Sequence, residues 1–230
     1  MKLLKDVPRN VLALGFVSMI TDISGEMIFS VLPLYMSGVL LFDKATIGLI
    51  EGIANSFANI SKLFSGYFSD KFGKRKPIVL AGYALSAVMR PMFAFAVLWH
   101  EMLFVRVTER LGKGIREAPR DAIIAESTTE KNRGKNFGVH RMMDTIGAII
   151  GPALAFVILA ATADNYNVLF WASIIPGAIA LGILHFFVKE SRPKAARQEA
   201  VKPQITASFV WAKFPPQYRR FLLTVGVFYA

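Results

Sequence analysis

Long apolar stretches alternate with short polar segments along most of this 230-residue chain. A helix needs about 20 mainly apolar residues to cross a hydrocarbon core about 30 Å thick. Six stretches suit such a span: residues 10–39, 45–68, 77–98, a more polar one that starts near Met102 and dissolves into polar residues from Leu111, 139–161 and 168–188. The pattern therefore predicts an all-α membrane protein with six transmembrane helices.

A seventh apolar run, FLLTVGVFYA, begins at Phe221 and reaches Ala230. Ten residues are too few to cross a bilayer, so we expect a truncated seventh helix. The predicted organisation is a six-helix transmembrane half over residues 1–190, a basic cytoplasmic linker over 191–217 and the start of the seventh helix over 218–230.

Composition and charge agree with a membrane protein. Hydrophobic residues make up 54% of the chain and charged residues 19%, with a formal net charge of +11. Most Lys and Arg residues lie at the N-terminus and after the second, fourth and sixth spans, whereas the alternate links hold only Lys44. Because basic residues accumulate in cytoplasmic loops, we expect a multi-pass protein of the cytoplasmic (inner) membrane with a cytoplasmic N-terminus. This distribution indicates that the positive charge contacts the lipid bilayer, and we expect no nucleic-acid partner.

The absence of cysteine excludes disulfides, Cys-based zinc sites and thiol nucleophiles. The three histidines, His100, His140 and His185, are scattered along the sequence, so ordinary loop or interfacial roles are favoured over a metal cage. We therefore expect no metal and no cofactor.

The link between the second and third spans reads GYFSDKFGKRKP. Gly66 permits close helix approach, Asp70 ends the span, Gly73 allows a tight reversal, and Lys74 and Arg75 anchor it at an anionic leaflet. Any polytopic protein can use such a basic hairpin. Its order and position, however, resemble the signature loop of the major facilitator superfamily.

Two further motifs extend the resemblance. In the fourth span, Arg106, Gly112 and Gly114 are similar to the family's arginine and glycine pair, although Arg110 stands where many members have a small residue. The fifth-helix signature associated with antiporters is matched by Gly138, Gly147, Gly151 and Pro152, but its two following glycines are replaced here. TDISGEM and GKGIREAPRDAIIAES look more narrowly like a poorly characterised prokaryotic group. The chain resembles the amino-terminal six-helix half of a family member throughout.

The resemblance implies alternating access, in which two six-helix bundles rock about a site near the midplane. It implies that Asp70 locks the cytoplasmic gate against a helix start in the missing carboxy-terminal half of the same protein.

Ionisable side chains inside the predicted spans are the candidate path. Each charge at a span centre costs roughly 2.5 to 3.5 kcal/mol on insertion scales, so these groups are expected to face one another or water. They are Asp22, Glu26, Glu51, Lys62, Arg90, Arg106, Glu109, Arg110, Arg141 and Asp144.

Helical spacing groups these charges. Asp22 and Glu26 lie one turn apart, and we interpret them as the proton or cation pair, because adjacent carboxylates in a low dielectric become protonatable. Arg106 is the expected counter-charge, alternating between a carboxylate and an anionic substrate group. Glu109 is expected to pair with Arg90 or Arg110. The simpler interpretation is a set of buried ion pairs that only fix helix packing.

The favoured function is a secondary transporter, not an enzyme, which exports a small polar, charged or amphipathic solute in exchange for protons. One alternative is a half-transporter with a structural or regulatory role. Another is a membrane enzyme acting on anionic headgroups through the charged fourth span, against which no activated Ser, Cys or metal triad is visible.

Overall fold

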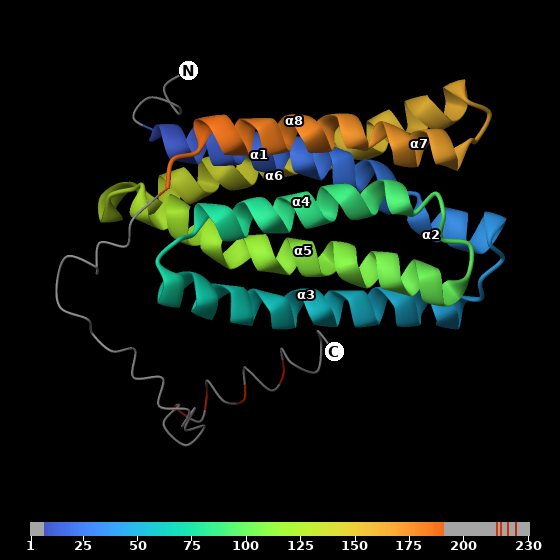
Figure 1. The fold of residues 1–230 in the computed structure, drawn as a ribbon, viewed down its shortest axis with the longest axis horizontal. Coiled ribbons are helices and arrows are strands. Elements are labelled where there is room, and N and C mark those ends of the chain that lie inside the picture. The colour runs from blue at the N-terminus through green and yellow to red at the C-terminus, as the bar shows by residue number, and fades with distance from the viewer. Residues whose placement is uncertain (1–6, 191–214, 216, 218–219, 221–223, 225–230) are drawn as a thin grey trace. The chain divides into compact units, whose positions relative to one another are not determined.

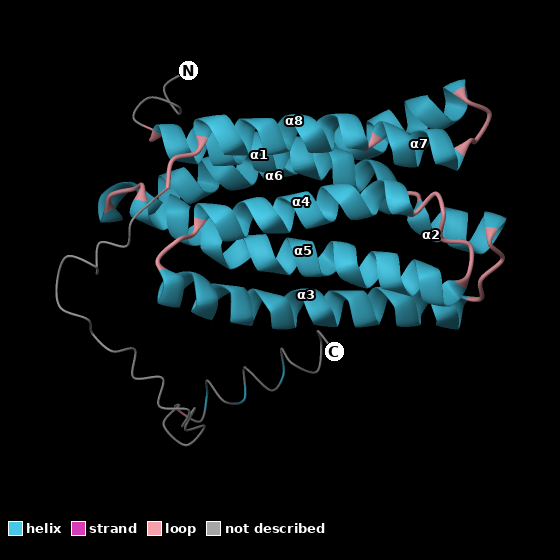
Figure 2. Ribbon diagram, in the orientation of Figure 1, coloured by secondary structure: helices cyan, strands magenta, loops and turns pink. Residues whose placement is uncertain are grey.

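The computed structural model describes residues 7–190 and, beyond them, only residues 215, 217, 220 and 224. The predicted linker over 191–217 and the predicted seventh helix over 218–230 therefore lie almost entirely outside the described residues. Helices form nearly all of the continuous part (Figure 2). They are α1 (Arg9–Phe29), α2 (Leu32–Leu34), the π-helical turn η1 (Tyr35–Val39), α3 (Lys44–Phe72), α4 (Lys76–Met92), α5 (Trp99–Glu126), the 3₁₀ turn η2 (Glu130–Asn132), α6 (Arg133–Ala161), α7 (Tyr166–Ala172) and α8 (Ile174–Phe187).

These helices form a bundle of six rods, because α2 and η1 extend α1 and α7 leads directly into α8 (Figure 1). The helices α3, α5 and α4 pack in that order, α4 then meets α8, and α8 packs on α1, which meets α6. Buried apolar side chains fill the contacts at both ends of the rods. The predicted all-α fold with six long helical segments is confirmed.

By length and composition, three described stretches qualify as membrane spans: Arg9–Val39, Glu130–Ala161 and Tyr166–Phe187. The helices α3, α4 and α5 fall outside those criteria but lie alongside the others in the same bundle. Charged side chains lower the hydropathy of α3 and α5, whereas α4, with 17 residues, is too short to qualify.

The ends of α3 follow from local chemistry. Asp43 caps its start, since the carboxylate accepts a hydrogen bond from the Thr46 backbone N–H at 3.0 Å. Hydrogen bonding from the Thr46 side chain and backbone holds the pKa of the Asp43 carboxyl below its usual value. Gly73 ends the helix with a left-handed φ of 61°, a conformation that glycine adopts without a steric penalty.

The fourth span is longer than predicted, which corrects the sequence interpretation. We expected it to dissolve from Leu111, but α5 continues unbroken to Glu126 and passes through a buried Pro119. The polar residues of this stretch find partners inside the bundle: Glu117 pairs with Lys62 at 3.1 Å, and Arg116 donates to Ser86 Oγ at 2.7 Å. The charge of these residues lowers the hydropathy of this part of α5.

Motif glycines set the closest helix contacts. A Cβ at Gly112 would lie 2.8 Å from the Gly82 carbonyl oxygen on α4, and one at Gly114 would overlap the Ala58 carbonyl oxygen on α3. The two glycines therefore let α5 touch both neighbours closely, which is the usual role of small residues between membrane helices. On α6, a Cβ at Gly147 would overlap the Met19 carbonyl oxygen of α1.

Candidate functional site

A continuous chain of charges crosses the half of the bundle formed by α3, α5 and α4. Arg106 of α5 donates from Nε and Nη2 to the two carboxylate oxygens of Glu51 on α3, at 2.8 and 2.9 Å. Its Nη1 lies 3.5 Å from Glu109 Oε2, and Glu109 Oε1 lies 3.7 Å from Arg90 Nη2 on α4. Three helices thus supply one alternating chain of two carboxylates and two guanidinium groups.

Three of the four residues of this chain are shielded from solvent, whereas the Glu51 side chain is 26% exposed. Glu109 is fully buried, and the side chains of Arg90 and Arg106 are 2% and 3% exposed. The Phe29 ring of α1 covers the Arg106 guanidinium at 4.0 Å from its centroid, a cation–π contact. Gly25 leaves room for Arg90, since a Cβ there would lie 3.1 Å from Arg90 Nη2. Of the two predicted partners of Glu109, the structure pairs it with Arg90.

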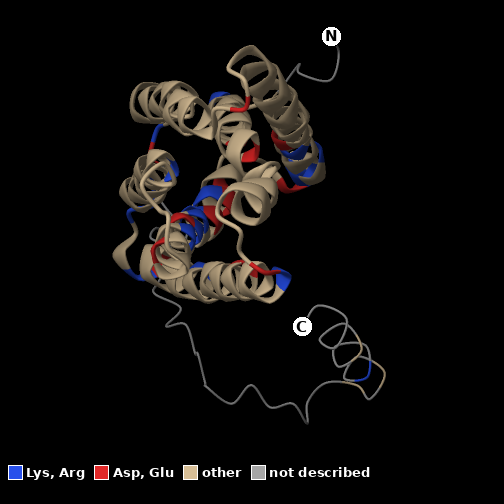
Figure 3. Ribbon diagram, turned by 90° about the vertical axis from the view of Figure 1, so that its right-hand side faces the viewer, with Lys and Arg blue, Asp and Glu red and all other residues tan. Residues whose placement is uncertain are grey.

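Asp22 and Glu26 lie on the side of α1 that approaches α6. A Cβ at Gly147 would lie 3.1 Å from Asp22 Cβ, and one at Gly151 would lie 2.8 Å from Glu26 Cβ. The fifth-helix glycines thus pack directly against the two carboxylate-bearing residues, which are only partly buried. Viewed along the helices, acidic and basic positions gather on the sides that face the middle of the bundle (Figure 3).

A second polar cluster lies between α5 and α6, and the sequence pattern identified its Asp144 but not the pairing with His140. His140 is buried, with Nδ1 3.5 Å from Asp144 Oδ2, and its Nε2 has no hydrogen-bond partner. Arg120 donates from Nη1 to Ser18 Oγ at 3.3 Å and pairs with Asp121 at 2.9 Å. His140 and Asp144 are one helical turn apart, so their i, i+4 spacing was the available signal.

Three predicted residues are exposed. The side chain of Arg141 is 83% exposed and reaches Asp144 only at 3.9 Å. Gly138 is exposed with open space around it, and Lys74 is exposed in the hairpin between α3 and α4.

The predicted gate hairpin is tied together by Arg75. Its guanidinium pairs with Asp70 of α3, at 2.9 Å, and with Glu126 at the end of α5. Its backbone N–H donates to Glu190 at 2.9 Å. Arg75 is 8% exposed while Asp70 is 70% exposed, so one side of the Asp70 carboxylate stays open beyond this contact.

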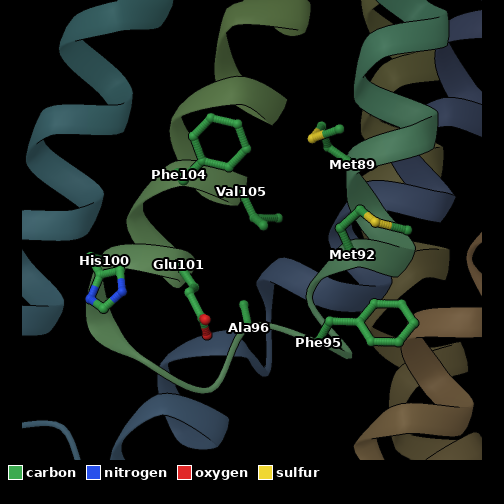
Figure 4. A pocket seen from close by; sticks show the side chains of 8 residues that line it. All are labelled: Met89, Met92, Phe95, Ala96, His100, Glu101, Phe104 and Val105. Carbon is green, nitrogen blue, oxygen red and sulfur yellow. The ribbon is translucent and has the colours of Figure 1, made fainter.

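The cavity between the ends of α4 and α5, of about 460 Å³, is unlike these clusters (Figure 4). Met89, Met92, Phe95 and Phe104 line it. The backbone N–H groups of Leu98 and Val97 both donate to the Glu101 carboxylate at 3.0 Å. The carboxylate is thus engaged as a helix cap, and the cavity is suited to apolar chains.

Within the described residues, no group of three or more His, Asp or Glu side chains is arranged to hold a metal ion. The charges are instead arranged in chains and pairs.

Comparison with known proteins gives one consistent result. The profile described as Major Facilitator Superfamily matches residues 14–230. An uncharacterised MFS-type transporter of Methanocaldococcus jannaschii is 34% identical over 97% of this chain and 54% of its own length. A Na⁺, Li⁺, K⁺/H⁺ antiporter of Planococcus maritimus is 29% identical over 72% of this chain and 39% of its own. The chain therefore spans about half the length of these relatives.

A solved structure has the same fold. A POT family transporter in complex with 5-aminolevulinic acid superposes with a TM-score of 0.71 over 81% of this chain and 40% of its own, at 19% identity.

Proposed function

Because this chain belongs to the major facilitator superfamily, we propose that its bundle is the amino-terminal half of a secondary active transporter. It works by alternating access together with a second six-helix bundle, carboxy-terminal to it in the same protein. The N-terminus is cytoplasmic, and the protein spans the inner membrane. The solute is small and polar, charged or amphipathic.

The observation that carries the proposal is the charge chain through Glu51, Arg106, Glu109 and Arg90. Burying an ion pair is often no better for stability than burying apolar side chains of similar volume. Charges at membrane depth therefore mark a solute or ion path as the first hypothesis. The chain also links three helices, so a change in one ion pair is transmitted to the packing of all three.

Coupling to protons is assigned to Asp22 and Glu26. They lie one turn apart on α1, partly buried and facing α6. A carboxylate in such a setting gains and loses a proton at a smaller free-energy cost than one paired with arginine. The antiporter-type glycines on α6 and the antiporter among the relatives favour export in exchange for protons.

The gate is assigned to the hairpin after α3. Arg75 holds the Asp70 carboxylate in place from one side and leaves the other side open. The exposed side of Asp70 then contacts the positive end of a helix in the second bundle. Opening on the cytoplasmic side breaks that contact.

The test is accumulation of labelled solutes in inverted membrane vesicles energised by a proton gradient, with the protein that contains both bundles. A panel of organic anions, organic cations and amino acids is offered. A transported member should lose gradient-driven accumulation in Asp22→Asn, with its downhill movement retained. Asp164→Asn is the matched control, because Asp164 is an exposed loop carboxylate with a φ of 60° that asparagine tolerates. Equal gradient-driven accumulation in wild type and Asp22→Asn would contradict the coupling assignment.

A further inference from the structure

The three cations along the inner face of α5 differ in what they contact. Arg106, Arg110 and Lys113 follow one another at helical spacing. Arg106 is committed to Glu51 and Glu109 and stacked on Phe29. Within residues 7–190, by contrast, Arg110 and Lys113 take part in no ion pair within 4.0 Å.

One hydrogen-bond donor of Arg110 has no acceptor among the described residues. Its Nε is buried and makes no hydrogen bond, although an unmade hydrogen bond on a buried charged group is unfavourable. Its guanidinium lies 5.3 Å from the Phe29 ring centroid. Phe29 therefore contacts two arginines that differ in their partners: Arg106 pairs with carboxylates, and Arg110 makes no ion pair within 4.0 Å among the described residues.

Carboxylates interact with the two cations only beyond ion-pair distance. Glu109, Glu51 and Glu26 interact electrostatically with Arg110, and Glu117 and Asp22 do so with Lys113. In the described residues none of these contacts reaches ion-pair distance. The helices α1 and α5 run in opposite directions through the bundle (Figure 1), so Asp22 and Glu26 follow one another in the opposite sense to Arg110 and Lys113.

We propose that Arg110 and Lys113 bind the carboxylate or phosphate group of the transported solute, with Phe29 as the apolar wall beside it. The assignment rests on the proposed transport function and names its solute class. Arg110 offers planar paired donors that suit a carboxylate or phosphate, and Lys113 adds a compact charge one turn away. Arg106 keeps its place in the charge chain with Glu51 and Glu109, and Arg110, one turn further along α5, contacts the solute.

The α1 carboxylates Asp22 and Glu26 determine which charged solutes the site accepts. A bare anion between Arg110 and Lys113 meets the negative charge of Asp22 and Glu26. It binds with the cationic end of the same molecule near α1, or with a proton taken up there. Organic cations without an anionic group meet Arg110 and Lys113 and are rejected.

The experiment measures the thermal unfolding midpoint of the purified protein in neutral detergent at constant ionic strength. The probes are benzoate, inorganic phosphate and the amino acid phenylalanine, with tetraethylammonium as the cation comparison. We expect a saturable stabilisation by at least one anionic or zwitterionic probe and none by tetraethylammonium. Its apparent affinity should fall roughly tenfold or more in Arg110→Gln/Lys113→Gln, since hydrogen bonds to charged groups are lost.

The control variant is Lys131→Gln/Arg133→Gln, which removes the same two charges from exposed positions before and at the start of α6. It should keep the wild-type response. If the test variant does not fold, Arg110→Lys and Lys113→Arg preserve the charge and should bind with reduced but measurable affinity.

Three outcomes would overturn the assignment: an unchanged response in Arg110→Gln/Lys113→Gln, stabilisation by tetraethylammonium in place of the anions, or stabilisation by vesicles of anionic lipid with none of the soluble probes active. Anion binding that depends on Arg110 and Lys113 without any transport would instead leave this site intact and refute the transporter proposal. Transport that is unchanged by the two substitutions would refute this binding site and leave the transporter proposal intact.

Discussion

Replacing Glu109 with glutamine tests the energetic basis of the charge chain. Glu109 is fully buried and is the carboxylate within ion-pair distance of Arg90, at 3.7 Å, while also lying 3.5 Å from Arg106. Arg106 keeps its two hydrogen bonds to Glu51 in the variant, but Arg90 keeps no carboxylate that close among the described residues. Removing one partner of a buried ion pair costs roughly 3 to 5 kcal/mol, because the remaining charge is left uncompensated.

The control is Glu117→Gln on the same helix. Glu117 also forms an ion pair, 3.1 Å from Lys62, but the two side chains are 23% and 46% exposed. Pairs with that much solvent contact are worth about 0.2 to 1 kcal/mol. The two variants therefore remove the same chemical group from α5 at different depths.

The assay is the free energy of unfolding in mixed micelles, from titration with a denaturing detergent and followed by loss of tertiary fluorescence. Glu109→Gln should fall below wild type by about 3 to 5 kcal/mol and Glu117→Gln by about 1 kcal/mol or less. A Glu109 variant within about 1 kcal/mol of wild type would refute the buried-charge reasoning.

Two further results are expected. Gly114→Leu should prevent α5 from packing on α3, because its Cβ would overlap the Ala58 carbonyl oxygen. In size-exclusion chromatography this variant should be recovered mainly as aggregate. The control, Gly134→Leu at a position with open space around it, should elute as wild type does. Asp43→Ala should reduce thermal stability near neutral pH, because alanine cannot accept the hydrogen bond from the Thr46 backbone N–H. Because the folded pKa of Asp43 is lowered, its contribution to stability is present above the ordinary value of 3.8 and is lost as the pH falls through the folded pKa. The difference in melting temperature between wild type and variant should therefore shrink on acidification below that value. A difference that grew would contradict the capping role.

The sequence predicted the number of long helices well, because apolar run length is a local property. It also predicted that charges inside the spans face one another or water, since the cost of exposing them to lipid does not depend on knowing the fold. Arg90, Arg106 and Glu109 pair inside the bundle, whereas Arg141 is 83% exposed. The glycines of the fourth and fifth spans were identified by pattern, and the structure places Gly112, Gly114, Gly147 and Gly151 at close helix contacts.

The sequence could not supply the partners that come from different helices. Glu51 and Arg106 are 55 residues apart, and nothing local joins them. The helical course of α5 beyond Leu111 was missed because its stabilising contacts, such as Lys62 with Glu117, come from tertiary structure. The buried pair of His140 and Asp144 was missed although its spacing was visible, because a single histidine carries little information without its surroundings.

The most direct test of the proposed mechanism is proton movement in proteoliposomes. The protein containing both bundles is reconstituted with a pH indicator inside, and a transported solute is added to one side without any imposed proton gradient. Proton-coupled transport predicts an internal pH change that requires the solute, reverses with the direction of its gradient and disappears in Asp22→Asn. Solute movement with no accompanying pH change, in wild-type protein, would contradict the account.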